Sequence, residues 1–217
     1  MEQGHRTSSR VQVKICGITS EADAIAAAEL GADALGFNFY RGSKRFVAID
    51  AAAEWIRRLP GSVAKVAVLV NSSWNDALKI GRLPFIDALQ LHGAESPDFC
   101  RKLIEKGVLV TKALPIKDER SLAQPTDYGS TRVLLDSGGE KFGGSGRTFP
   151  WSLARRFVEA HPELEVILAG GLTPDNVAGA IRIVQPFGVD VTSGIEADYG
   201  IKDRRLLEAF ISSAHSA

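Results

Sequence analysis

The sequence is short of the residues that characterise several common protein classes. It contains two cysteines and four histidines among 217 residues, and Cys16 and Cys100 stand far apart. Two isolated cysteines do not indicate the framework of a small disulfide-rich secreted domain. No CxxC motif or Cys/His cluster is present, so we predict no zinc site.

Net charge and long apolar runs are also missing. Lys and Arg total 26, Asp and Glu total 26, and the formal net charge is zero, so no overall field attracts nucleic acid or an anionic membrane. No apolar run is long enough to cross a bilayer, and residues 1–10 lack the apolar core of a signal peptide. We expect a cytoplasmic protein that binds neither nucleic acid nor membrane, with residues 1–10 as a flexible N-terminal arm.

What the sequence does contain is a regular alternation of short apolar runs and helix-forming stretches. The apolar runs predict eight strands: Val11–Ile15, Ala34–Phe39, Ala64–Val70, Asp87–Leu91, Val108–Ala113, Val133–Leu135, Glu165–Ala169 and Val189–Thr192. Strands that are apolar on both faces are typical of a parallel sheet covered by helices. Eight units of about 27 residues each favour a closed barrel over an open sheet of about five or six strands. We therefore predict an α/β fold, a single-domain (β/α)8 TIM barrel, over residues 11–217.

Capping residues predict where several helices begin. Ser20 precedes one helix-forming stretch, and Ser96 precedes a proline that suits the first helical position. Thr173-Pro174 gives the same signal for a later helix. The stretch Lys117–Ala123 predicts only a weak helix.

Glycine-containing turns follow predicted strands six, seven and eight. The residues concerned are Gly144, Ser145, Gly146, Gly170, Gly171, Ser193 and Gly194. The simpler interpretation of any one of them is a tight turn between strand and helix. Taken together they favour a phosphate site, because glycine lets backbone N–H groups approach an anion near a helix N-terminus.

Polar residues that end or interrupt apolar strands are candidates for catalysis, because barrel active sites lie at the C-terminal ends of the strands. Cys16 is either a small buried apolar residue or a base beside Lys14, which lies on the same strand face. Asp136 follows an apolar strand and is either a loop cap or a general acid. Asp190 interrupts strand eight and either binds substrate or anchors a lysine inside the barrel.

Two further candidates lie in loops at the same end. Arg45 belongs to the basic segment Arg41–Arg45, which is either a solvated loop or a clamp for a carboxylate, a group that the planar guanidinium binds bidentately. His92 is the only histidine near a strand end, and it either contacts substrate or bridges loops.

In chain order, these motifs resemble those of the phosphoribosylanthranilate isomerase family. The matching segments are Lys14–Ile18, Phe37–Phe39, Ser43–Val47, Val70-Asn71, Gln90–Gly93, Leu134–Asp136, Gly143–Phe149, Leu168–Leu172 and Gly188–Glu196. Each motif alone is weak, but the ordered set is specific. One departure is Lys44, where the family usually has proline, which loosens the loop that carries Arg45.

The resemblance implies a TIM-barrel aldose-ketose isomerase of tryptophan biosynthesis. The implied reaction is the Amadori rearrangement of N-(5-phosphoribosyl)anthranilate by general acid-base catalysis. Asp136 would be the general acid and Cys16 the general base. Arg45, His92 and Asp190 would bind substrate, and the glycine turns would hold its phosphate. The resemblance implies no cofactor and no metal, and a monomer or homodimer with a phosphorylated aminosugar as its small-molecule partner.

Three other functions are less consistent with these residues. An aminoaldose isomerase of histidine biosynthesis would be expected to carry a carboxylate where Cys16 stands. A metal-dependent pentose-phosphate epimerase would need several histidine ligands at strand ends. A barrel that only binds a phosphosugar would have no need for both an acid and a base.

Overall fold

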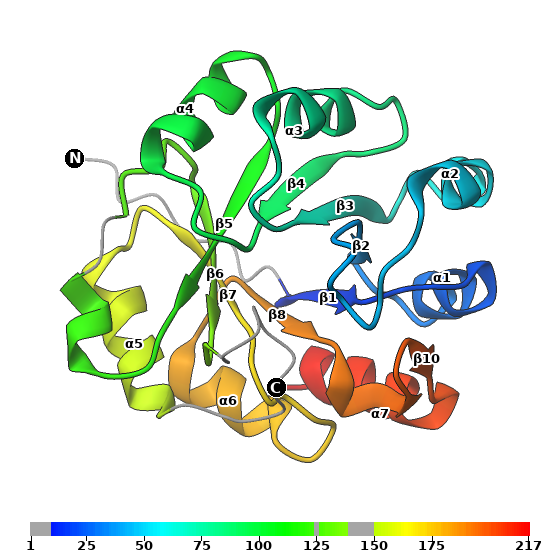
Figure 1. Ribbon diagram of the computed structural model, residues 1–217. Coiled ribbons are helices and arrows are strands. Elements are labelled where there is room, and N and C mark those ends of the chain that lie inside the picture. Colours follow the sequence, from blue (N-terminus) through cyan, green and yellow to red (C-terminus); the bar gives the residue numbers. More distant parts are fainter. Residues whose placement is uncertain (1–9, 124–125, 139–149) are drawn as a thin grey trace, which may run out of the picture.

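The barrel predicted from the alternating pattern is confirmed. A computed structural model describes residues 10–123, 126–138 and 150–217 of the chain. Within this part, eight parallel strands form a closed barrel, and helices surround it (Figure 1). The ring closes because β1 pairs with both β2 and β8.

The barrel strands overlap the eight predicted ones, with ends that differ by no more than two residues. The strands are β1 (Gln12–Cys16), β2 (Ala34–Asn38), β3 (Ala64–Leu69), β4 (Ala88–Leu91), β5 (Val110–Pro115), β6 (Arg132–Asp136), β7 (Glu165–Leu168) and β8 (Gly188–Val191). The helices are α1 (Glu21–Glu29), α2 (Ile49–Arg58), α3 (Trp74–Gly81), α4 (Pro97–Glu105), α5 (Trp151–Ala160), α6 (Val177–Val184) and α7 (Arg204–His215). The weak helix expected after β5 is a short 3-10 helix, η1 (Glu119–Ala123).

The segment between β8 and α7 contains structure that the pattern did not predict. A 3-10 turn, η2 (Ser193–Ile195), leads into a hairpin of β9 (Glu196–Asp198) and β10 (Ile201–Lys202). This hairpin places Glu196 within hydrogen-bonding reach of Arg45, in the loop after β2, and Lys202 within reach of Cys16 at the end of β1.

Side chains of the strands alternate between two apolar layers. Val13 and Ile15 of β1 and Leu135 of β6 belong to the large core between barrel and helices. Their neighbours along each strand point to the opposite face, into the barrel. A separate buried cluster of Ala113, Leu134, Ile167 and Ala169 lies on that inner face. Lys14, Cys16 and Asp136 therefore face the barrel interior.

Two predictions concern residues outside the described part. Gly144, Ser145 and Gly146 lie outside it, and so do residues 1–9 of the predicted arm. The division of the chain at residue 11 therefore stays a prediction. Among the helices that the structure describes, none is long and apolar enough to cross a membrane.

Candidate active site

Cys16 and Asp136 end two strands at the same end of the barrel. Cys16 is the last residue of β1, and Asp136 is the last residue of β6. Two strands, β7 and β8, separate β6 from β1 around the ring, so the two side chains face the mouth from different sides. Their exposed fractions are 8 % and 6 %. A thiol and a carboxyl group placed in this way can each contact a different atom of one bound molecule.

Lys14 and Asp190 form a buried ion pair next to Cys16. They are register partners of β1 and β8, and Lys14 Nζ donates to Asp190 Oδ1 at 2.6 Å. Burial lowers the pKa of Lys14, but the charge of Asp190 and the hydrogen bond to it outweigh this effect, and the pKa lies above its usual value. Lys14 is therefore a cation. Asp190 has the lysine-anchoring contact that was one of its two predicted roles.

Arg45 lies in a second buried network with Glu196 and Lys202. Arg45 Nε and Nη2 donate to the two carboxylate oxygens of Glu196 at 2.8 and 2.6 Å. Lys202 Nζ donates to Glu196 Oε1 at 3.0 Å and to the carbonyl oxygen of Cys16 at 2.7 Å. Because two donors of Arg45 are held by Glu196, only its other N–H groups can reach a substrate carboxylate.

The pKa values in this network follow from burial and pairing. The hydrogen bond to Glu196 raises the pKa of Arg45. Burial alone would raise the pKa of Glu196, but hydrogen bonds and charges from Arg45 and Lys202 bring it below its usual value. Burial lowers the pKa of Lys202 despite its contact with Glu196.

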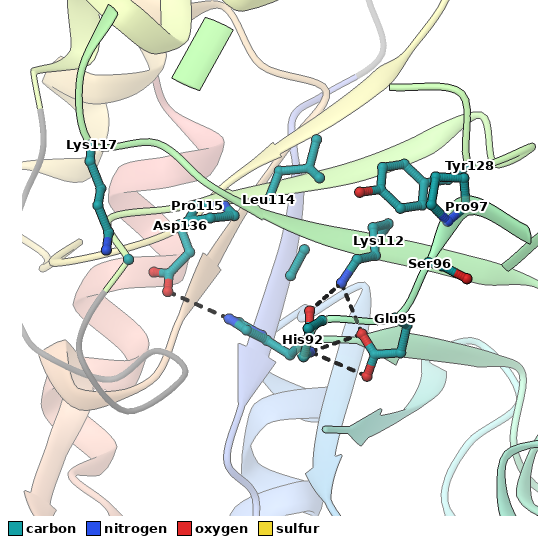
Figure 2. Close-up of a pocket in the computed structure, with 14 residues that line it drawn as sticks. His92, Glu95, Ser96, Pro97, Lys112, Leu114, Pro115, Lys117, Tyr128 and Asp136 are labelled. Atoms are coloured by element: carbon teal, nitrogen blue, oxygen red, sulfur yellow. Dashed lines mark hydrogen bonds and ion pairs between the residues drawn. The ribbon is translucent and has the colours of Figure 1, made fainter. Parts of the chain in front are cut away.

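Asp136 is connected to His92 on the other side of the mouth. His92 Nε2 lies 3.5 Å from Asp136 Oδ2 (Figure 2). Gln90 Nε2 lies 3.0 Å from His92 Nδ1. With the amide of Gln90 donating to Nδ1, the neutral imidazole carries its hydrogen on Nε2, toward Asp136. The structure thus brings His92 to the candidate acid.

A cavity of about 490 Å³ opens beside this pair, between the loops that follow β4, β5 and β6. Its lining includes His92, Asp136, Lys117 and Tyr128 (Figure 2). Its volume lies in the range of small-molecule sites, about 300–1,000 Å³. Asp136 therefore has room for a ligand next to its carboxyl group.

A buried ion pair supports the cavity wall. Lys112 Nζ donates to Glu95 Oε2 at 2.9 Å and to the carbonyl oxygen of Gly93 at 2.7 Å. Glu95 also accepts from the backbone N–H groups of Asn71 at 2.8 Å and of Gly93 at 2.9 Å. The pair thus joins the loops after β3 and β4, the second of which begins at His92.

Gly170 and Gly194, in the turns after β7 and β8, leave no room for a side chain. Gly170 and Gly171 have φ values of +86° and +67°. A Cβ on Gly170 would lie 2.8 Å from the backbone nitrogen of Ser137, and one on Gly194 would lie 1.9 Å from the carbonyl oxygen of Leu172. Main-chain segments of neighbouring loops approach each other closely here, which fits both a tight turn and a backbone anion site.

The sequence analysis missed Glu95, Lys112 and Lys202 as contributors to the site. A lysine inside a mostly apolar strand was the available signal for Lys112, because a buried ammonium group needs a carboxylate partner. The partner itself was not predictable, since the pairing joins separate elements.

Comparison with known proteins gives consistent matches over nearly the whole chain. Residues 13–213 match the family model of N-(5'-phosphoribosyl)anthranilate (PRA) isomerase. The N-(5'-phosphoribosyl)anthranilate isomerase of Thermotoga neapolitana is 45% identical over 204 residues, covering 94% of this chain and 98% of that protein.

Solved structures agree with the sequence matches. The crystal structure of phosphoribosyl anthranilate isomerase from Thermotoga maritima superposes with a TM-score of 0.88 and 41% identity, over 95% of this chain and all of that one. A phosphoribosyl anthranilate isomerase in complex with reduced 1-(o-carboxyphenylamino)-1-deoxyribulose 5-phosphate has a TM-score of 0.84 and 39% identity, and it covers 95% of this chain and 100% of that chain.

Proposed function

The chain belongs to the N-(5'-phosphoribosyl)anthranilate isomerase family, and from this membership we propose that Asp136 and Cys16 carry out the proton transfers of the reaction. The enzyme converts N-(5-phosphoribosyl)anthranilate into 1-(2-carboxyphenylamino)-1-deoxyribulose 5-phosphate, an Amadori rearrangement in tryptophan biosynthesis. The observation that carries the proposal is that β1 and β6 end in a thiol and a carboxyl group at one barrel mouth.

The first step opens the sugar ring. Asp136 gives its proton to the furanose oxygen while the bond from that oxygen to C1 breaks. The lone pair of the anthranilate nitrogen forms a C1=N double bond, and Asp136 is left as a carboxylate. His92 Nε2 faces this carboxylate and stabilises the charge that develops there.

The second step moves a proton from carbon. The Cys16 thiolate removes the proton from C2, the C–H electrons form a C1=C2 double bond, and the C=N electrons return to nitrogen. The resulting enolamine tautomerises: its hydroxyl proton is lost and C1 gains one, which gives the ketone. Every proton transfer uses the chain's own side chains or solvent, so no cofactor takes part.

The remaining candidate residues bind the substrate in this proposal. The N–H groups of Arg45 that Glu196 does not hold bind the anthranilate carboxylate, and Asp190 and His92 contact the sugar. Backbone N–H groups of the late glycine turns hold the phosphate: Gly144, Ser145, Gly146, Gly170, Gly171, Ser193 and Gly194. The positive φ values of Gly170 and Gly171 support this role for their turn.

Cys16→Ser and Asp136→Asn test the two central roles. Loss of substrate fluorescence, followed with purified protein, should slow by about a hundredfold or more in each variant. Cys100→Ala is the matched control, because Cys100 is the other thiol, lies buried in α4, and has a pKa raised by burial to about 11. Unfolding curves establish that each variant is folded.

Full turnover in a Cys16→Ala variant would remove Cys16 as the base. Complementation of a tryptophan auxotroph by the unaltered chain, and its failure with the two variants, tests the same roles in a cell.

We also propose a cytoplasmic location, since a phosphorylated substrate does not cross membranes freely. We propose further that the protein is a monomer or a homodimer, two states that light scattering distinguishes.

A further inference from the structure

Lys14 and Cys16 converge on the empty space above Gly36. Gly36 in β2 is the register partner of Cys16 in β1. A Cβ built on Gly36 would lie 2.7 Å from Cys16 Sγ and 3.0 Å from Lys14 Nζ. The ammonium and the thiol thus both lie within 3.0 Å of one point above Gly36. The missing side chain of Gly36 is therefore what lets these two groups meet.

The surroundings of the thiol hold more positive than negative charge. Among the residues that the structure describes, the charged groups around it are Lys14, Arg45 and Lys202, together with their partners Asp190 and Glu196. All five lie in a buried environment. An excess buried charge is costly unless it is balanced. These five groups are therefore one negative charge short, which is the charge that a deprotonated thiol carries.

Charged and titratable groups farther out do not change this balance. The Asp23 carboxylate accepts from the backbone N–H of Lys202 at 3.3 Å. Lys44 Nζ lies 3.7 Å from the ring centroid of Tyr199 at the rim of the mouth. Asp23 and Lys44 contribute one charge of each sign, so together they leave the balance unchanged.

Lys14 is the cation with a hydrogen bond available for the thiol. Lys202 Nζ has three donors and uses them on the carbonyl oxygens of Cys16 and Thr192 and on Glu196 Oε1. Arg45 directs its Nε and Nη2 groups to Glu196. Lys14 Nζ gives one hydrogen bond to Asp190, which leaves its two other N–H groups for the sulfur.

We propose that Lys14 is a positioning residue for the isomerisation: its ammonium, oriented by Asp190, stabilises the thiolate of Cys16 in the space that Gly36 leaves open. The proposal rests on the role of Cys16 as the base. It adds that the base depends on Lys14 and Gly36, two residues that need not touch the substrate.

A titration of the thiolate tests this directly. The ultraviolet absorbance of the thiolate is followed against pH, and the spectrum of Cys16→Ala is subtracted so that only Cys16 is observed. In Lys14→Met, the midpoint should move to higher pH by roughly one to two units, because a charged hydrogen bond to the thiolate is lost. Turnover should fall at neutral pH and recover partly as the pH is raised.

Gly36→Ala tests the same contact with every charge retained. Its new methyl group should separate the two side chains and shift the midpoint in the same direction. Gly61→Ala is the control for this change, since a Cβ there meets nothing within 4 Å. Lys65→Met is the control for Lys14→Met, because Lys65 is also a buried strand lysine, with Asp87 3.5 Å away, at the opposite end of the barrel.

Unchanged midpoints in both Lys14→Met and Gly36→Ala would overturn the proposal. If Lys14→Met does not fold because Asp190 is left unpaired, the double variant with Asp190→Asn provides the measurement. Full turnover of Cys16→Ala combined with a shifted midpoint in Lys14→Met would support the contact while removing Cys16 as the base, so the two failures are distinguishable.

Discussion

Removal of the ammonium group of Lys112 should destabilise the protein strongly. Lys112 Nζ donates to Glu95 at 2.9 Å and to the carbonyl oxygens of Leu91 and Gly93 at 3.1 and 2.7 Å, and both side chains of the ion pair are 3% exposed. Lys112→Met leaves the Glu95 carboxylate buried without its cation. Breaking a buried pair on one side costs about 3–5 kcal/mol, so we expect the free energy of unfolding in urea to fall by that amount.

Lys102→Met is the matched control for this prediction. Lys102 Nζ lies 2.8 Å from Asp98 Oδ2, but the two side chains are 59% and 63% exposed. Water screens this pair, so we expect its unfolding midpoint to stay unchanged. Adding Glu95→Gln to Lys112→Met should recover part of the lost stability. Small, equal effects of the two lysine substitutions would refute the reasoning that burial, and not the distance between charges, sets the cost.

Two further predictions concern a glycine and a histidine. Gly194→Ala places a Cβ 1.9 Å from the carbonyl oxygen of Leu172 and should cost about 1–3 kcal/mol in thermal unfolding, whereas Gly61→Ala should cost nothing; equal melting temperatures would contradict this. Burial and the charge of Arg10 lower the pKa of His215 below its ordinary 6.5, so the folded state binds this proton less readily than the unfolded state. Protonation of His215 therefore favours the unfolded state, and the free energy of unfolding falls as the pH drops below about 6.5. The urea midpoint should therefore drop more between about pH 7.5 and pH 5.5 in the unaltered chain than in His215→Gln; equal drops would exclude the effect.

The first residues of the helices show which features a local sequence signal can predict. Ser20 and Ser96 cap α1 and α4 as predicted, each with its side chain accepting a backbone N–H three residues on. The start predicted at Thr173-Pro174 is wrong, because α6 begins at Val177. Asn176 Oδ1 instead accepts from the backbone N–H of Thr173 at 2.8 Å and its Nδ2 donates to Gly171 at 3.0 Å. The asparagine thus fixes the turn before α6, a role that a capping pattern does not reveal.

The sequence predicted where the candidate site lies better than it predicted which of its side chains contact each other. Cys16, Asp136 and His92 were singled out because polar residues at the ends of apolar strands are rare and costly. Their place at one barrel mouth follows from strand order. That Asp136 faces His92, and that Arg45 is held by Glu196, depends on how the strand ends and the β9–β10 hairpin come together.

By itself, the sequence determined the eight strand–helix units and the residues at the strand ends, because these depend on neighbours a few positions apart. Only the tertiary structure decided the ion pairs around Cys16. Lys14 and Asp190 are 176 positions apart, and Arg45 and Glu196 are 151 apart. Such pairs exist only once β8 closes the ring against β1, since ring closure removes the charged groups from water and brings groups of opposite sign within reach of each other.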